Sequence, residues 1–436
     1  MEQSILNALS ERIIIYDGAT GTNIQMRNLV SDDFGGPALE GCNEILCVTR
    51  PDVIRDIHAS FFEVGVDVVE TNSFGSIPPV LAEYSIAERS YELNLEAAKL
   101  AKQVASDFSA DGRYRWVAGS MGPGTKLPSL GQIGFYELRD AYTIQAQALI
   151  EGGVDLLLIE TCYDLLQIKA AMIGARRAMQ TLSRQVPLQV QVTVELTGRM
   201  LLGTEIGAAL TSIDAMRPDI FGMNCATGPL EMSEHIRYLS RHCRMPISTL
   251  PNAGLPSVVD GKMHYDLTPE GLADSLSGFI QEFGVSVVGG CCGTTPEHLA
   301  QVVDKCSKLE VPQRSPLHEP GVSSIYTNVS FRQDTSYLSV GERSNANGSK
   351  KFREAMLSAD WDTCLSVGLE QVKEGAHLID VCVDYAGADG IADMTEIVSR
   401  FATQVSLPLM LDSTEAPVIE AGLIWIGGRA ILNSVN

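Results

Sequence analysis

The stretch VDLLLIETC, from Val154 to Cys162, shows most clearly a pattern that recurs along the chain. Four consecutive apolar residues followed by polar ones are typical of a strand buried on both faces of a parallel sheet. Similar runs alternate with helical patterns up to about residue 300. The eight runs are Ile13–Gly21, Val66–Phe74, Trp116–Gly124, Val154–Cys162, Leu188–Glu195, Asp219–Gly228, Pro246–Gly254 and Val285–Gly293.

Eight βα units in about 300 residues predict an α/β fold, a (β/α)8 TIM barrel spanning residues 1–309. An open, doubly wound sheet is the alternative, although such sheets more often have five or six strands. Residues 310–335 are rich in Pro, Ser and polar residues, and we expect a linker there.

The alternation resumes over residues 336–436, which carry four more predicted strands. Four βα units cannot close a barrel, so we expect a second, incomplete (β/α) barrel with an exposed parallel edge. This pattern suggests a fragment that ends within its second barrel. The four runs are Tyr337–Asn345, His377–Tyr385, Leu407–Thr414 and Arg429–Asn436.

The composition limits the classes of partner. The 436 residues are 45% hydrophobic and carry a formal net charge of −22. Strong acidity argues against nucleic-acid or membrane binding, so we expect small-molecule or protein partners. The N-terminal stretch has no basic region or long apolar run typical of a signal peptide, which predicts a cytoplasmic protein with free, metal-bound or catalytic cysteines.

Three of the ten cysteines follow predicted strands. Cys225 lies in GMNCATGP, and the adjacent Cys291 and Cys292 lie in GGCCGTTP. Because the carboxyl ends of barrel strands meet at one mouth, the three thiols can converge and bind Zn²⁺ with one position open. Each could instead be a small core residue, which is our interpretation for the other seven. Those seven are Cys42, Cys47, Cys162, Cys243, Cys306, Cys364 and Cys382.

Carboxylates and amides follow the other strands of the predicted barrel. Glu160 ends a very apolar run, which makes a purely structural role less attractive, whereas Asn252 could also be a turn residue. Glu70 and Glu195 could equally be solvated. The full set of polar strand-end residues is Asp17, Glu70, Asn72, Ser120, Glu160, Glu195, Asn224 and Asn252.

The residues around the three cysteines carry a resemblance. GMNCATGP and GGCCGTTP, together with YDGATGT at Tyr16–Thr22, are similar to the homocysteine S-methyltransferase domain over residues 8–306. The stretch SVGERSNANGSKKF at Ser339–Phe352 resembles the start of a pterin-binding domain. Two such domains in this order resemble the cobalamin-dependent methionine synthase family, rather than relatives that use betaine or S-methylmethionine.

The resemblance implies a catalytic zinc held by Cys225, Cys291 and Cys292, with Asn252 as a displaceable fourth ligand. It also implies that Asp17, Gly18 and Glu160 hold the amino and carboxylate groups of L-homocysteine, and that Glu160 belongs to the catalytic set. We expect Asn72 and Ser120, at neighbouring strand ends, to complete the substrate contacts.

For the methyl donor, the resemblance implies methylcobalamin as immediate donor and 5-methyltetrahydrofolate as methyl source. No D-x-H-x-x-G signature occurs in the chain, so we expect a cobalamin module outside it, normally on the same polypeptide. Asp380 and Asp384 are further candidates for pterin binding. The predicted pterin contacts are Glu342, Asn345, Asp412 and Asn433.

Two other functions remain open from the residues. A stand-alone homocysteine S-methyltransferase would use another methyl donor, and the pterin-like region argues against it. A non-catalytic zinc-thiolate or redox-sensing protein would have four fixed protein ligands and would not respond to homocysteine.

Overall fold

The structure is a computed structural model that describes residues 4–259, 262–311 and 313–434. Its larger sheet has eight parallel strands in the order β1-β10-β7-β6-β5-β4-β3-β2. These strands are β1 (Ile14–Ile15), β2 (Val68–Glu70), β3 (Trp116–Met121), β4 (Leu156–Cys162), β5 (Leu188–Val192), β6 (Ile220–Asn224), β7 (Ile247–Leu250) and β10 (Val287–Val288).

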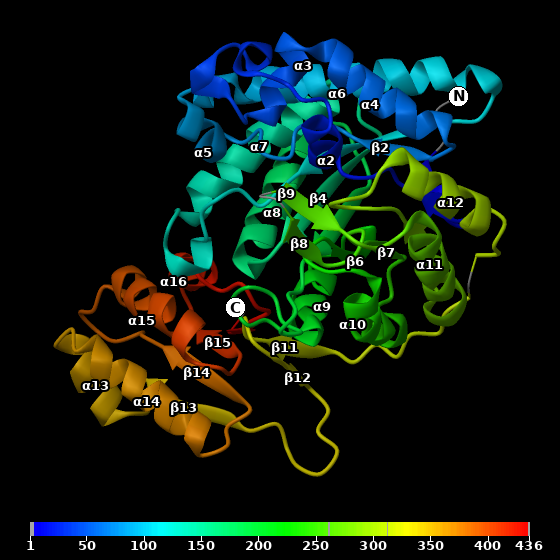
Figure 1. The fold of residues 1–436 in the computed structure, drawn as a ribbon. Helices are drawn as coiled ribbons and strands as arrows, with labels where there is room; N and C mark the ends of the chain where they lie inside the picture. The colour runs from blue at the N-terminus through cyan, green and yellow to red at the C-terminus, as the bar shows by residue number, and fades with distance from the viewer. Residues whose placement is uncertain (1–3, 260–261, 312, 435–436) are drawn as a thin grey trace.

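The two ends of this sheet meet. Tyr16 pairs with Val68 in a parallel bridge, and the Asp17 amide donates to the Val68 carbonyl at 3.0 Å. The predicted eight-stranded barrel is therefore confirmed, and the open sheet is excluded. The main surrounding helices are α4 (Pro51–Glu63), α6 (Ser90–Phe108), α7 (Phe135–Glu151), α8 (Leu165–Thr181), α9 (Ile206–Asp214), α10 (Pro229–His242), α11 (Pro269–Phe283) and α12 (Pro296–Cys306) (Figure 1).

Shorter helices, 3₁₀ turns and a hairpin lie in the connections between these strands and helices. A hairpin of β8 (Pro256–Val259) and β9 (Lys262–Tyr265) follows β7, where no strand was predicted. The short α-helices are α1 (Ile5–Ala8), α2 (Thr20–Gln25), α3 (Leu46–Thr49) and α5 (Pro78–Leu81). The 3₁₀ turns are η1 (Ser31–Phe34), η2 (Pro37–Leu39), η3 (Asn43–Ile45), η4 (Ala82–Tyr84), η5 (Ala87–Arg89), η6 (Ser109–Asp111) and η7 (Pro128–Leu130).

The barrel interior contains polar pairs as well as aliphatic side chains. The Tyr16 hydroxyl donates to Gln189 Oε1 at 2.7 Å, and Gln191 Nε2 donates to Ser248 Oγ at 3.0 Å. Such pairing satisfies groups that would otherwise be costly to bury. No helix within the described ranges has both the length and the apolar character needed to cross a bilayer.

The segment 310–335, expected to be a linker, contains an antiparallel hairpin. Its strands are β11 (Gly321–Ser323) and β12 (Asn328–Ser330). The Ser323 hydroxyl lies 2.8 Å from that of Ser212 in α9, and it accepts from the Arg429 amide at 3.0 Å. This hairpin thus contacts both helix α9 of the barrel and Arg429 of the C-terminal region.

The smaller sheet has four parallel strands in chain order, as predicted. The strands are β13 (Val340–Asn345), β14 (Leu378–Cys382), β15 (Leu409–Asp412) and β16 (Ile431–Asn433). Its helices are α13 (Lys350–Leu357), α14 (Trp361–Lys373), α15 (Gly390–Gln404) and α16 (Ala416–Leu423). The partly buried Lys169 of α8 links this region to the barrel, because its ammonium donates to the Leu423 and Ile426 carbonyls at 2.7 and 3.0 Å.

Candidate metal and substrate site

Three cysteines converge at the mouth of the barrel. Cys225 follows β6, while Cys291 and Cys292 follow β10, and β7 lies between these two strands in the sheet. The three sulfurs all lie within 4.8 Å of one another, and those of Cys225 and Cys292 are 3.7 Å apart. This is the only group of three or more potential Cys, His, Asp or Glu ligands found among the described residues.

The backbone of the cysteine loops has an unusual conformation. Cys225 and Ala226 have φ values of 62° and 60°, in the left-handed region that non-glycine residues rarely adopt. The Cys225 amide donates to the Leu250 carbonyl at 3.2 Å, and the Cys291 amide donates to the Pro251 carbonyl at 2.8 Å. Backbone hydrogen bonds to the end of β7 therefore hold both loops in place. They stabilise the strained backbone at Cys225 and Ala226, and strain of this kind often occurs at functional sites.

Asn252 supplies a further oxygen near the end of β7. Its side chain is buried, and its Oδ1 atom has no hydrogen-bond partner among the described residues. An unpaired buried carbonyl oxygen is costly unless something binds it. Three thiolates and one such oxygen form a donor set that fits a tetrahedral zinc ion. The residues present therefore fit the metal that the sequence suggested.

A cavity of about 340 Å³ opens beside the cysteines. The predicted residues Asn72, Ser120 and Glu160 line it, whereas Asp17, Gly18 and Asn252 are not part of its lining. Among the residues whose side chains the structure describes, no Lys, Arg or His contributes to the lining. The lining residues are Ala19, Thr20, Gly21, Thr22, Gln25, Asn43, Glu44, Glu70, Thr71, Asn72, Phe74, Ser120, Glu160, Thr161, Cys225, Met263, Tyr265, Gly290, Cys291 and Cys292.

Three carboxyl groups cluster beside this cavity. Burial raises the pKa of Asp17, Glu70 and Glu160, and for Glu160 the pKa rises to about 7. Repulsion from the Glu160 carboxylate adds to the effect at Asp17 and Glu70. Asp17 Oδ1 and Glu70 Oε1 have no hydrogen-bond partner in the described chain. A buried acidic cluster with no cation among the described lining residues suits a small ligand that carries an ammonium group.

Asn224 connects the carboxyl cluster to the cysteines. Its Nδ2 atom lies 3.2 Å from Glu160 Oε2 and 3.9 Å from Cys291 Sγ, and its Oδ1 accepts from the Thr161 amide at 2.7 Å. On the other side, the Ser120 hydroxyl donates to Glu160 Oε1 at 2.5 Å. Both Glu160 oxygens are therefore oriented by neutral donors.

Sequence reasoning missed several lining residues. Glu44 comes from the long segment after β1, and its Oε1 accepts from the Gly75 amide at 2.8 Å. Met263 and Tyr265 come from the unpredicted β8–β9 hairpin. The pair Asp260-Gly261, between runs of strand-forming residues, is the sequence signal that could have predicted this hairpin. Glu195, in contrast, is exposed and outside the lining.

The predicted pterin residues lie on the smaller sheet. Asn345, Asp412 and Asn433 occupy one row across the sheet, because Asn345 pairs with Cys382, Cys382 with Asp412, and Asp412 with Asn433. Asn345 Nδ2 also donates to Asp380 Oδ2 at 2.9 Å. Glu342 lies outside this row and is exposed.

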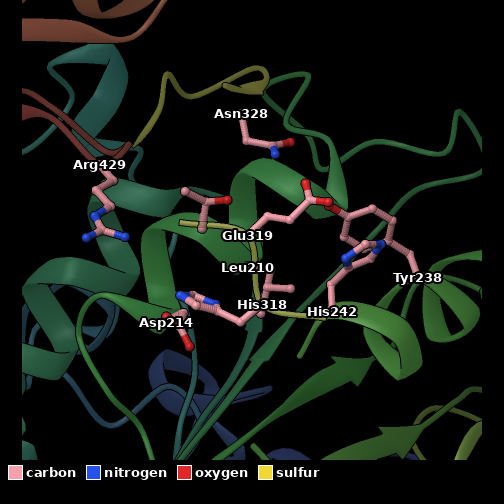
Figure 2. A pocket seen from close by; sticks show the side chains of 9 residues that line it. Leu210, Asp214, Tyr238, His242, His318, Glu319, Asn328 and Arg429 are labelled. Atoms are coloured by element: carbon pink, nitrogen blue, oxygen red, sulfur yellow. The ribbon is translucent and has the colours of Figure 1, made fainter. Parts of the chain in front are cut away.

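A second, much smaller hollow of about 30 Å³ lies where the chain after α12 crosses α9 and α10 (Figure 2). The rings of Tyr238 and His242 stack there at 4.5 Å, and Asp214 is paired with Arg244 at 2.7 Å. Its acidic and histidine side chains do not converge as metal ligands in the described part of the chain. The candidate metal ligands and the larger cavity therefore both lie at the barrel mouth.

The fold and site define a (β/α)8 barrel with three cysteine thiols at the carboxyl ends of its strands. The chain belongs to the homocysteine S-methyltransferase family, a class of methyltransferases, because residues 14–306 match that family. Residues 341–436 match the pterin binding enzyme family.

Individual relatives agree with this assignment. The chain is 53% identical over 435 residues to a methionine synthase of Mycobacterium tuberculosis, and 51% identical over 440 residues to one of Mycobacterium leprae. It spans 36% of the length of each of these relatives. The metallated homocysteine methyltransferase MmuM of Escherichia coli shares the fold, with a TM-score of 0.56 and 22% identity over 68% of this chain and 98% of that one.

Proposed function

We propose that the barrel binds L-homocysteine and presents its thiol for methylation, giving L-methionine. One observation carries the proposal: three cysteine sulfurs lie within 4.8 Å of one another at a cavity that Glu70 and Glu160 also line, and Glu70 Oε1 has no hydrogen-bond partner among the described residues. Soft ligands for a metal and an acidic subsite for an ammonium group thus lie in one small space.

Cys225, Cys291 and Cys292 would hold zinc, with Asn252 as the ligand that homocysteine displaces. A free thiol with a pKa near 8.5 is mostly protonated at neutral pH. Bound zinc supplies the positive charge that favours the thiolate form of the substrate. The substrate proton would leave to solvent, and the sulfur would supply the electron pair for the new bond to the methyl carbon. The bond between that carbon and the donor would break, with its electron pair remaining on the donor.

Glu160 and Asp17 would orient the amino acid through its ammonium group. Both carboxyl groups are buried, and charge pairing with the ammonium favours their ionised forms. Ser120 and Asn224 hold Glu160 in place, and Asn72 on the cavity lining would add a polar contact. Gly18 lies outside the lining, and its proposed contact rests on the family resemblance alone. Orientation of this kind brings the sulfur to the cavity mouth, where it meets the methyl donor.

We propose methylcobalamin as the immediate donor and 5-methyltetrahydrofolate as the methyl source. A cavity of about 340 Å³ suits an amino acid and not a corrin, so the donor would approach from outside, carried by a cobalamin module. The row formed by Asn345, Asp412 and Asn433, with Glu342 nearby, would bind the pterin.

The proposed organisation is a homocysteine domain at 1–309, a connecting segment at 310–335 and a pterin domain at 336–436. A reducing, cytoplasmic location accompanies the proposal, because thiols must stay reduced to bind the metal.

The test uses the purified chain under anaerobic conditions. Zinc-loaded and metal-free protein are mixed with L-homocysteine and free methylcobalamin, and methionine formation is followed with the cobalamin spectrum. The proposal expects turnover that requires zinc and is lost in Cys291→Ala. Cys306→Ala, at a buried thiol in α12 away from the mouth, is the matched control and should retain turnover.

Each alternative has its own outcome. Turnover with betaine or S-methylmethionine, but not with methylcobalamin, would indicate another donor. Bound zinc that gives no turnover, and whose coordination does not change with homocysteine, would indicate a structural or redox site.

A further inference from the structure

Two loops that follow neighbouring strands meet at the cavity. Residues 17–22, the β1 turn, follow β1, and residues 290–294, the cysteine loop, follow β10. Because β1 and β10 are paired parallel strands, both loops leave the sheet on the same side. Residues 19–22 of the first loop and 290–292 of the second line the cavity. A ligand held by the cysteines therefore lies beside the β1 turn.

Thr294 joins these two loops from behind the cavity wall. Its side chain is 0% exposed, and it is not part of the cavity lining. Thr294 Oγ1 accepts from the Ala19 amide at 3.3 Å, and the same hydroxyl donates to the Cys291 carbonyl at 2.6 Å. A single hydroxyl thus uses its acceptor on the β1 turn and its donor on the cysteine loop.

Two glycines make room for the Thr294 side chain. A Cβ added at Gly18 would lie 2.4 Å from Thr294 Oγ1, and one added at Gly290 would lie equally close to it. Neither glycine has a left-handed φ, so the need for glycine at these positions comes from space rather than from backbone conformation. The hydroxyl is therefore fixed in a narrow gap between the β1 turn and the cysteine loop.

Two backbone amides of the cysteine loop also reach the β1 turn. The Gly290 amide donates to the Asp17 carbonyl at 3.0 Å, and the Gly293 amide donates to Thr22 Oγ1 at 3.0 Å. The two loops therefore form one hydrogen-bonded unit, in which a movement of one displaces the other. Thr22 lines the cavity, so the Thr294 hydroxyl is the contact of this unit that a substitution can remove without changing the cavity wall.

The two contacts of the Thr294 hydroxyl are not equally replaceable. The Thr294 amide also donates to the Cys291 carbonyl, at 3.1 Å, so this carbonyl keeps a partner when the hydroxyl is removed. The Ala19 amide would instead face a methyl group if residue 294 were valine. Because an amide that loses its acceptor inside a protein costs free energy, the loss falls on the β1 turn and not on the cysteine loop.

We propose that Thr294 is a positioning residue for homocysteine, whose hydroxyl holds the β1 turn in register with the metal-binding cysteines. Metal binding at the cysteine loop then preorganises the turn for the amino-acid end of the substrate. By linkage, the metal raises the affinity for an amino acid even when that ligand has no thiol. This inference rests on the proposed function, because it requires a metal at the three cysteines and homocysteine in the cavity.

The experiment uses L-2-aminobutyrate, which is homocysteine without its thiol, so that direct sulfur-to-metal contact does not contribute. Its dissociation constant is measured by NMR titration of the zinc-loaded and metal-free forms of the wild type and of Thr294→Val. Chelator competition gives the zinc affinity, and thermal unfolding of the metal-free proteins reports on folding. The matched control is Thr249→Val in β7, because Thr249 is also 0% exposed and its hydroxyl has no hydrogen-bond partner among the described residues.

We expect zinc to tighten L-2-aminobutyrate binding by about 5-fold or more in the wild type, and by at most about half that factor in Thr294→Val. The zinc affinity of Thr294→Val should stay within about 5-fold of the wild type, since the amide of residue 294 still holds the Cys291 carbonyl. Thr249→Val should match the wild type in both measurements. Thr294→Ser, which keeps the hydroxyl, should restore the wild-type gain, and it replaces the valine variant if that protein does not fold.

Two results would overturn the role of Thr294: no zinc-induced gain in the wild type, or an equal gain in the wild type and in Thr294→Val. Either result would leave the proposed function intact if zinc-loaded wild type still binds homocysteine. A wild-type chain whose homocysteine binding does not depend on zinc would overturn both the role of Thr294 and the proposed function.

Discussion

The mouth of the eight-stranded barrel and the strand ends of the four-stranded sheet carry similar residues in different surroundings. In the barrel, Asp17 and Glu160 are 1% and 5% exposed. On the smaller sheet, Glu342 and Asn433 are exposed and Asp412 is half-buried. Carboxylates and amides near strand ends are thus common to both regions, but the smaller sheet leaves more of them exposed, although its Asp380 is only 2% exposed.

Closure of the sheet accounts for this difference. The bridge between Tyr16 and Val68 joins β1 to β2, so loops from all sides surround the barrel mouth. In the described part of the smaller sheet, β13 and β16 are edge strands, and water reaches the strand ends. Burial then raises the pKa of Glu160 to about 7, whereas no comparable enclosure surrounds Glu342. Enclosure, rather than residue type, makes a preorganised site.

The largest expected effect tests whether metal binding belongs to the barrel alone. Cys291→Ala should lose tight zinc binding and at least about 100-fold in methionine formation, because two thiolates cannot replace three. Asp412→Ala on the smaller sheet should keep full zinc content. Metal analysis of both proteins after dialysis checks this. Equal zinc content in the two variants would contradict the assignment of metal binding to the barrel alone.

The next effect concerns the acidic subsite. Glu160→Gln should weaken homocysteine binding by roughly 10- to 100-fold, about 1.4 to 2.8 kcal/mol, because the ammonium group loses a buried partner. Calorimetric titration of the zinc-loaded protein measures this. The matched change Glu342→Gln should leave the affinity as it is, and a similar loss there would show that the two regions do not act separately.

A third effect is the pH dependence of stability in the metal-free chain. The pKa of Glu160 is about 7 when folded, against 4.5 for the ordinary group, so the folded state keeps a proton that the unfolded state loses between these values. Stability should therefore fall as the pH rises from about 4.5 to 7, by at most about 3 to 4 kcal/mol from this group. Urea midpoints across this range should fall less steeply in Glu160→Gln, whereas an unchanged slope would contradict the buried-acid interpretation.

The smallest effect concerns the connection between the two regions. Lys169→Met removes the donor to the Leu423 and Ile426 carbonyls, and it should destabilise the end of α16 by about 1 to 3 kcal/mol. Faster amide hydrogen exchange near residue 423 is the measurement. Lys99→Met, at an exposed i,i+3 pair with Glu96, should change stability by under about 1 kcal/mol.

Much of the fold could be predicted from local pattern. All twelve predicted strands are present, because a strand buried on both faces needs an uninterrupted apolar run such as Leu156–Ile159. The β8–β9 hairpin and the β11–β12 hairpin were missed. Both are short, and the β11–β12 hairpin lies in a polar, turn-rich sequence that resembles a loop. Distant residues such as Gly293 and Ser212 supply contacts to the two hairpins.

The sequence by itself determined the alternation of strands and helices, and it placed Cys225, Cys291, Cys292 and Glu160 at strand ends, because parallel strands all point their carboxyl ends to one side. Only the tertiary structure decided which groups share an enclosed space. The left-handed turn at Cys225, the unpaired Asn252 oxygen and the packing of the Tyr265 ring against Gly293 all depend on contacts between distant residues. Local propensity cannot encode such contacts, since they form between residues far apart in the chain.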